Sequence, residues 1–167
     1  MSKILTIIAP QGYQDIEYEE PKKILQQKGH QVITASLTPT AYGSLGGKTK
    51  VDIILNEVKP EEYNAIVFIG GPGSTVYFDN KTALNLAKTF YESNRLTCAI
   101  CAAPIILANA GLLKDKKATC YAGGSQDITS KGAKYTGKPT EIDGKIITGN
   151  GPMSAKLFGE LIAKNLS

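Results

Sequence analysis

The sequence has few of the residues that recognise nucleic acids. Its 167 residues include no tryptophan and one arginine, Arg95, although 19 residues are lysine or arginine and the net charge is +4. Arginine makes most of the bidentate contacts to phosphate and guanine, and the lysines are scattered and form no stripe with aromatic residues. The composition therefore argues against a nucleic-acid partner.

The chain also lacks a long apolar run, a leader pattern and an even set of cysteines. No apolar run approaches the roughly 18 residues of a membrane span, and no signal-peptide pattern precedes the first apolar segment, which begins by Lys3. Three cysteines in a chain of this length argue against a disulfide scaffold. We therefore expect a cytoplasmic protein without a membrane partner.

Only one histidine is present, and its place in the chain limits the possible chemistry. His30 precedes the apolar segment 32–37, so it would lie at the amino end of that strand. Sites in parallel sheets form at the carboxyl ends of the strands, which leaves no histidine for a cysteine–histidine peptidase pair within one subunit. With a single histidine the chain also lacks the commonest zinc ligand, so we predict that the protein has no metal site.

Short apolar segments alternate with helical segments along the whole chain. Continuous apolar strands separated by helices predict a parallel sheet covered on both faces, which is a three-layer α/β/α sandwich. No linker, repeat or low-complexity tract divides the chain, so we expect one domain over residues 1–167. We expect strands at 4–9, 32–37, 65–69, 96–100 and 117–121. We expect helices at 16–28, 81–93 and 152–163. Hairpins are expected over 42–55 and around the turn at Asp143-Gly144.

Cys101 is the most informative residue. It ends the strand-like segment 96–100 and opens the helix-like segment 102–108. A strand that turns directly into a helix exposes its junction residue on a strained bend, as in a nucleophile elbow, and the small neighbours Ala99 and Ala102 suit such a bend. We expect the helix N-terminus to favour the thiolate. The alternative is a buried cysteine that acts as a small apolar residue.

Cys98 and Cys101 have the C-x-x-C spacing of a redox pair, but the strand context argues against one. Residues three apart in a strand point to opposite faces and lie about 10 Å apart, whereas a disulfide requires Cα atoms within about 7 Å. We expect Cys98 and Cys120 to be core residues of their strands.

Two further segments are candidates for the same site. The glycines of Gly70-Gly71-Pro72-Gly73 form either a flexible turn or an oxyanion hole, with the Gly71 N–H beside that of Ala102. Glu17 lies near the start of the first helix, where a carboxylate is favourable in any protein. Pro21 has no N–H for the Glu17 carbonyl, so we expect that turn of the helix to be distorted.

Four segments together resemble the ThiJ/PfpI superfamily, which includes the parkinsonism-associated deglycase, PfpI-type intracellular peptidases and class I glutamine amidotransferase-like proteins. The resemblance implies a flavodoxin-like sandwich, a homodimer or higher oligomer, a reactive Cys101 with Glu17 facing it, and backbone donors at Gly71 and Ala102. It also implies supporting roles around the site for Gly70, Tyr121, Asn150 and Pro152. The matching segments are 12–21, 67–73, 99–104 and 149–152.

The sequence departs from the superfamily's branches at two positions. PfpI-like peptidases have histidine directly after the cysteine, whereas Ala102 follows Cys101 here, which argues against a peptidase. The deglycase branch often has a histidine in the strand after the elbow helix, and Tyr121 stands at that position. A phenol donates a hydrogen bond but is a poor base near neutral pH.

The resemblance implies an enzyme that acts without metal or organic cofactor on small dicarbonyls, a glyoxalase or deglycase in stress defence. Cys101 would attack the aldehyde carbon and Glu17, protonated near pH 7, would transfer protons. The alternatives are a non-catalytic cysteine redox sensor or stress chaperone and, with less support, an intracellular cysteine peptidase.

Overall fold

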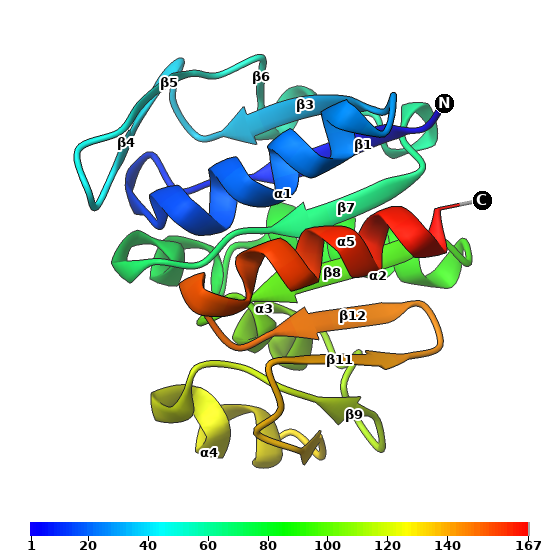
Figure 1. The fold of residues 1–167 in the computed structure, drawn as a ribbon. Coiled ribbons are helices and arrows are strands. Elements are labelled where there is room, and N and C mark those ends of the chain that lie inside the picture. Colours follow the sequence, from blue (N-terminus) through cyan, green and yellow to red (C-terminus); the bar gives the residue numbers. More distant parts are fainter. Residues whose placement is uncertain (167) are drawn as a thin grey trace.

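The computed structural model describes residues 1–166 and is built around a seven-stranded sheet. All neighbouring strands pair in parallel except the edge strand β11, which is antiparallel to β12. The predicted α/β sandwich is therefore confirmed (Figure 1). In spatial order the strands are β11 (Thr140–Asp143), β12 (Ile146–Gly149), β8 (Leu96–Ile100), β7 (Ala65–Phe68), β1 (Lys3–Ile7), β3 (Gln31–Ser36) and β6 (Ile53–Ile54).

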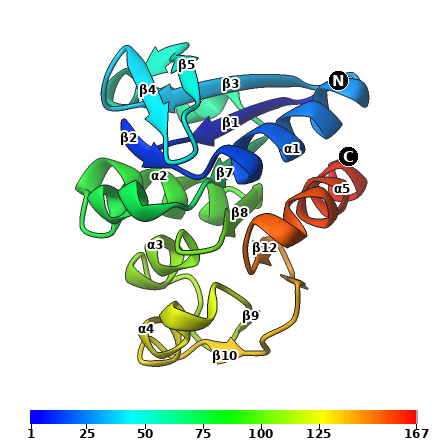
Figure 2. The same cartoon turned by 60° about the vertical axis from the view of Figure 1, so that its left-hand side comes forward.

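Helices cover both faces of this sheet. The long helices α1 (Asp15–Gln27) and α5 (Ala155–Asn165) pack against each other on one face, and α2 (Lys81–Glu92) and α3 (Pro104–Asn109) pack on the other (Figure 2). The remaining helical segments are α4 (Ser125–Thr129) and the 3₁₀ turns η1 (Leu55–Glu57), η2 (Pro60–Glu62), η3 (Pro72–Tyr77), η4 (Ala122–Gly124) and η5 (Pro152–Ser154).

Two small sheets flank the main one. The three-stranded sheet joins β2 (Gln11–Tyr13), β4 (Thr40–Gly43) and β5 (Lys48–Lys50), and the two-stranded sheet joins β9 (Lys117–Ala118) and β10 (Lys134–Tyr135). The hairpin expected over 42–55 forms between β4 and β5, but the segment then continues into β6 of the main sheet. The hairpin predicted at Asp143-Gly144 is confirmed by β11 and β12.

Two expected elements differ from the structure. The strand expected over 117–121 pairs only through its first two residues, in β9. The closing helix expected to begin at Pro152 opens with the 3₁₀ turn η5 before α5. The helix expected over 16–28 forms as α1, which continues through Pro21 to Gln27.

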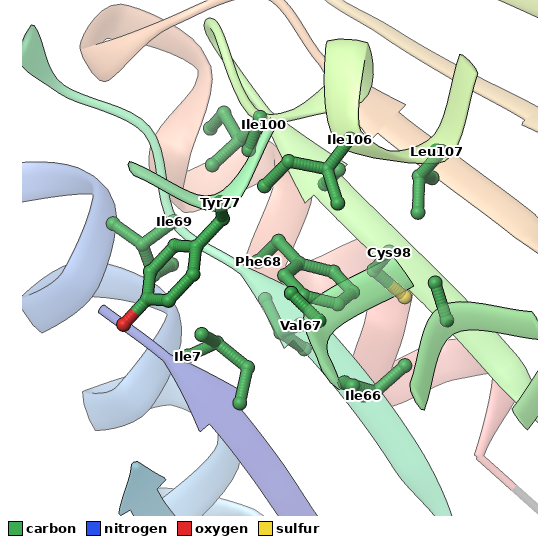
Figure 3. Close-up of a cluster of buried hydrophobic side chains, with 14 of the residues drawn as sticks. Ile7, Ile66, Val67, Phe68, Ile69, Tyr77, Cys98, Ile100, Ile106 and Leu107 are labelled. Carbon is green, nitrogen blue, oxygen red and sulfur yellow. The ribbon is translucent and has the colours of Figure 1, made fainter. Parts of the chain in front are cut away.

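The core lies between the sheet and its helices and contains Cys98, as predicted. The strands β7 and β8 are completely buried and contribute Phe68 and Cys98, which Figure 3 shows within one cluster of apolar side chains. Burying one such large apolar side chain stabilises the fold by about 1.5–3 kcal/mol. The buried Tyr77 hydroxyl donates to the carbonyl of Ile8 over 2.7 Å and so satisfies its polar atom.

The topology brings four chain segments to one edge of the sheet. The strands β1, β7, β8 and β12 are parallel neighbours, so their carboxyl ends lie together. Ligand sites of open α/β sheets form at this edge.

None of the helices within residues 1–166 has the length and apolar character needed to cross a membrane.

Candidate functional site

Cys101 directly follows β8 and has a strained backbone, as the sequence predicts. Its φ of +65° lies in the left-handed region, which is uncommon for any residue with a side chain. Two main-chain hydrogen bonds hold it there: its N–H donates to the Gly149 carbonyl, and its carbonyl accepts from the Tyr121 N–H, both at 2.9 Å. Strain of this kind clusters at functional sites.

The backbone N–H groups of Gly71 and Ala102 both face the Cys101 sulfur and act to lower its pKa. The two donors predicted for an oxyanion hole therefore lie beside the candidate nucleophile. Gly71 has a φ of +109°, and a Cβ there would lie 2.5 Å from both the main-chain nitrogen of Gln14 and the carbonyl oxygen of Gly12. Only glycine fits this position, because any side chain would displace the main chain around it.

Gly70 separates Cys101 from Glu17. A Cβ on Gly70 would lie 2.7 Å from the Cys101 Cβ and 2.7 Å from the Glu17 Oε1. The absence of a side chain at this position therefore allows the two functional side chains to approach each other. The Gly70 N–H also donates to Glu17 Oε1 over 3.0 Å and fixes the carboxyl group.

Glu17 is completely buried in the first turn of α1, behind Cys101. Burial raises the pKa of Glu17 to about 7, against the lowering effects of the neighbouring Cys101 side chain and of the hydrogen bond from the Gly70 N–H. Its second oxygen, Oε2, is buried and receives no N–H or O–H donor from residues 1–166. Since a buried carboxylate without such donors is costly, the environment favours the protonated form.

The expectation that the helix N-terminus would lower the thiol pKa is wrong. Burial, followed by the negative charge of Glu17, raises the pKa of Cys101 to about 12. The helix α3 has six residues and begins only at Pro104, so its dipole is too small and too distant to compensate. The pair therefore loses one proton near pH 7 and the second near pH 12, with a single negative charge between these values.

A pocket of about 320 Å³ opens above Cys101. Tyr121, about 38% exposed, lies at this pocket with its ring against Gly123 and Gly124. Four of the lining residues, Gln14, Pro72, Thr75 and Phe78, were not singled out from the sequence as site residues, although they lie in the segments 9–17 and 70–78, which follow strands and were expected at this edge of the sheet. The lining residues are Gln14, Gly71, Pro72, Thr75, Phe78, Cys101, Ala102 and Tyr121.

Asn150 and Pro152, expected near the site, do not line this pocket. The Asn150 N–H donates to the Pro139 carbonyl, and its side chain hydrogen-bonds to Ser154. These contacts shape the loop that follows Gly149, the residue whose carbonyl holds the Cys101 backbone. Asn150 and Pro152 therefore lie beside the elbow and outside the pocket.

The other cysteines and the histidine lie away from this chemistry. Cys98 and Cys120 are buried free thiols, and the Cys120 sulfur donates to the Tyr121 carbonyl. His30 Nδ1 accepts from the Ser2 N–H, at the amino end of the strands, as the sequence predicts. Residues 1–166 contain no group of three or more histidine, cysteine, aspartate or glutamate side chains arranged to hold a metal ion.

The fold and the site together define a class of protein: a flavodoxin-like sandwich with a cysteine on a strained elbow and a buried glutamate beside it. The chain belongs to the DJ-1/PfpI family, whose model matches residues 2–165. The resemblance stated from the four sequence segments is therefore confirmed.

Individual relatives agree with this assignment. An uncharacterised protein of Methanocaldococcus jannaschii is 39% identical over 98% of this chain and 82% of its own length. The protein named deglycase PfpI of Pyrococcus furiosus is 31% identical over 90% of each chain. Among solved structures, a ThiJ/PfpI domain protein from Brachyspira murdochii has a TM-score of 0.95 and 32% identity, covering 97% of this chain and 94% of its own.

Proposed function

We propose that this protein is a cofactor-independent enzyme that uses Cys101 to convert small reactive dicarbonyls, such as methylglyoxal, in the cytoplasm. The observation that carries the proposal is the Cys101 sulfur itself, which faces two backbone N–H donors and one buried carboxyl at the floor of a mostly apolar pocket. The deglycase names of several relatives support the same class of substrate.

The first step is addition of the Cys101 thiolate to the aldehyde carbon. A C–S bond forms, and the electron pair of the C=O π bond moves to oxygen, where the Gly71 and Ala102 N–H groups stabilise the charge. Glu17 then gives its proton to this oxygen, which produces a neutral hemithioacetal and leaves a carboxylate.

The second step moves a proton between the two carbons. The Glu17 carboxylate removes the proton from the carbon bonded to sulfur and returns it to the neighbouring carbon, through an enediol. The hydroxyl proton on the first oxygen moves to the second oxygen, which gives a thioester of a 2-hydroxy acid. Water then attacks the thioester, the C–S bond breaks, and the thiolate leaves with lactate as the product from methylglyoxal. The overall change adds one water and needs no oxidant.

This sequence of steps requires the proton of the pair to lie on Glu17 at the start. Burial and the absence of an N–H or O–H donor at Oε2 favour the protonated Glu17 up to about pH 7, whereas burial and the facing carboxyl raise the pKa of Cys101 to about 12 and oppose the thiolate. The two backbone N–H groups at the sulfur act against this rise and favour the thiolate that the first step needs.

Incubation of the purified protein with methylglyoxal tests the proposal. We expect lactate from the wild type and at least about a hundredfold less from Cys101→Ala, because the nucleophile is absent. Cys120→Ala is the matched control, since Cys120 is a buried free cysteine that does not line the pocket. Equal lactate formation by wild type and Cys101→Ala would overturn the proposal.

The same geometry favours a second candidate, a cysteine redox sensor. A half-buried sulfur beside a protonated carboxyl and two N–H donors would stabilise the added oxygens of a sulfinate. Mass spectrometry after mild peroxide treatment is the test. Selective addition of two oxygens at Cys101 without aldehyde turnover favours the sensor, and earlier oxidation of Cys98 or Cys120 argues against it.

A peptidase has less support. Its histidine would have to come from another subunit, because His30 lies at the opposite end of the strands. Absence of activity on unfolded proteins and fluorogenic peptides would remove this candidate.

A further inference from the structure

Gln14 has one orientation that the hydrogen bonds fix. Its side-chain Oε1 caps helix α1 by accepting from the Glu17 N–H over 2.9 Å. Its main-chain N–H donates to the Gly70 carbonyl over 2.9 Å. A backbone N–H can only donate, so the amide atom facing Glu17 must be the oxygen. The side-chain nitrogen Nε2 consequently points away from the helix end.

The Nε2 group is free to bind a ligand. This nitrogen has no hydrogen-bond partner within residues 1–166 and is not completely buried, so a ligand can reach it. Gln14 lines the same pocket as Cys101, Gly71 and Ala102. A carboxamide with two unused N–H donors is therefore available in a mostly apolar pocket.

The pocket favours an uncharged ligand. No lysine, arginine or histidine lines it, and the Cys101–Glu17 pair below it carries a negative charge above about pH 7. A carboxylate or phosphate would therefore lack a cation and face repulsion. A neutral molecule with two adjacent carbonyl oxygens matches the donors present, with one oxygen at the Gly71 and Ala102 N–H groups and the other at Gln14.

We propose that Gln14 selects uncharged vicinal dicarbonyls over simple aldehydes by donating an Nε2–H hydrogen bond to the second carbonyl oxygen. This inference rests on the proposed function and names the residue that would determine its specificity. When the carbon next to sulfur loses its proton, the electron pair forms the C=C bond of the enediol and negative charge develops on that second oxygen. A fixed N–H donor is stronger toward such an oxygen than toward a ketone, so it would favour the transition state.

The variant Gln14→Glu tests the donor while it keeps the helix cap. Its carboxylate still accepts from the Glu17 N–H, but it has no N–H for the ligand. Asn80→Asp is the matched control, because Asn80 caps α2 by the same contact with the Ala83 N–H, at 2.9 Å, and does not line the pocket. Gln14→Met, uncharged and similar in size, separates loss of the donor from gain of a charge.

The readout is the dissociation constant of the Cys101 hemithioacetal, measured by NMR with ¹³C-labelled methylglyoxal and with ¹³C-labelled propanal as the simple aldehyde. We expect the preference for methylglyoxal to fall about tenfold in both Gln14 variants, as for loss of one good hydrogen bond, and to stay unchanged in Asn80→Asp. Taking the ratio of the two ligands cancels any general change in thiol reactivity.

The outcomes separate this inference from the proposed function. An unchanged preference in both Gln14 variants overturns the role of Gln14 even if lactate forms normally. A lost preference only in Gln14→Glu also overturns it, because the added charge would then be the cause. A wild type that forms the adduct with the expected preference but releases no lactate supports Gln14 as a binding residue and contradicts the enzyme.

Discussion

At the residue scale, one position without a side chain controls the site. Gly70 separates Cys101 from Glu17, and an added Cβ would contact both at 2.7 Å. The carboxyl and the thiol are themselves held from other directions, Glu17 by helix α1 and Cys101 by its main-chain bonds to Gly149 and Tyr121. A methyl group at residue 70 would therefore force the pair apart.

Gly70→Ala is expected to uncouple the two groups while the rest of the fold remains. Overpacking of this kind costs about 1–3 kcal/mol of stability. We expect the pH dependence of Cys101 alkylation in Gly70→Ala to lose the inflection near pH 7 that the wild type owes to Glu17. Iodoacetamide labelling followed by mass spectrometry measures it. An unchanged profile in a folded variant would show that Glu17 does not influence the sulfur.

Burial of Glu17 also makes stability depend on pH. Because the folded-state pKa is about 7 and the ordinary pKa of a glutamate is 4.5, the folded protein binds more protons between these pH values. The stability that the neutral carboxyl contributes is fully present below pH 4.5 and is lost as pH rises through 7. Glu17→Gln lacks this titration, so wild type should lose about 3 kcal/mol relative to it between pH 4.5 and 8. Urea unfolding at several pH values measures the difference, and parallel curves for the two proteins would contradict the buried, neutral state.

At the element scale, local sequence predicted the elements whose signals are local. The hairpin at Asp143-Gly144 and the elbow at Cys101 depend on a few adjacent residues, and both form as expected. The strand expected over 117–121 stops early because the Thr119 N–H donates to the Thr148 side chain in place of a neighbouring strand. The strand β2 was missed, since its three residues pair with β4, about 30 residues further along the chain.

The residues of the candidate site were also predictable where they belong to a local sequence motif. Cys101, Gly71 and Ala102 belong to strand–turn segments that can be recognised along the chain, whereas Gln14 and Phe78 lie in loops expected at this edge but carry no local motif that marks them as pocket residues. The thiol pKa was predicted in the wrong direction for the same reason, since burial and the facing carboxyl are not visible in the local sequence.

Asp15 links two elements next to the site. Its buried carboxylate, in the first turn of α1, accepts from the Leu45 N–H at 2.9 Å and the Gly47 N–H at 2.7 Å, in the turn between β4 and β5. A Cβ on Gly43 would lie 2.3 Å from this carboxylate, which explains the glycine. The turn is therefore attached to the helix that carries Glu17.

Asp15→Ala should destabilise the protein by about 2–4 kcal/mol, because two N–H groups lose a charged acceptor. The amides of Leu45 and Gly47 should also exchange faster with solvent. Asp143→Ala is the control, since its carboxylate accepts from the Lys117 N–H over 2.9 Å near the surface and its loss should cost only about 1 kcal/mol. Urea unfolding and hydrogen exchange measure the effects. Equal losses in the two variants would contradict a special role for Asp15.

At the scale of the whole molecule, the layer formed by α1 and α5 has apolar side chains on its outer surface. Ile16 is 41% exposed, Leu157 is 48% exposed and Met153 is fully exposed. These residues lie in the first turn of α1, in the first turn of α5 and in η5, and both helices begin at the same end of the layer (Figure 1). Exposed apolar side chains near the beginnings of two packed helices are candidates for an interface contact.

We expect this surface to form the contact in the homodimer or larger oligomer that the family resemblance implies. A charge at Leu157 would have to be buried without a partner, so Leu157→Glu should shift the protein towards monomers. Leu45→Glu is the control, because Leu45 is 64% exposed in the turn between β4 and β5, outside this surface. Sedimentation equilibrium gives the mass of each species. A monomeric wild type, or an oligomer that Leu157→Glu leaves intact, would show that this apolar surface is not the contact between subunits.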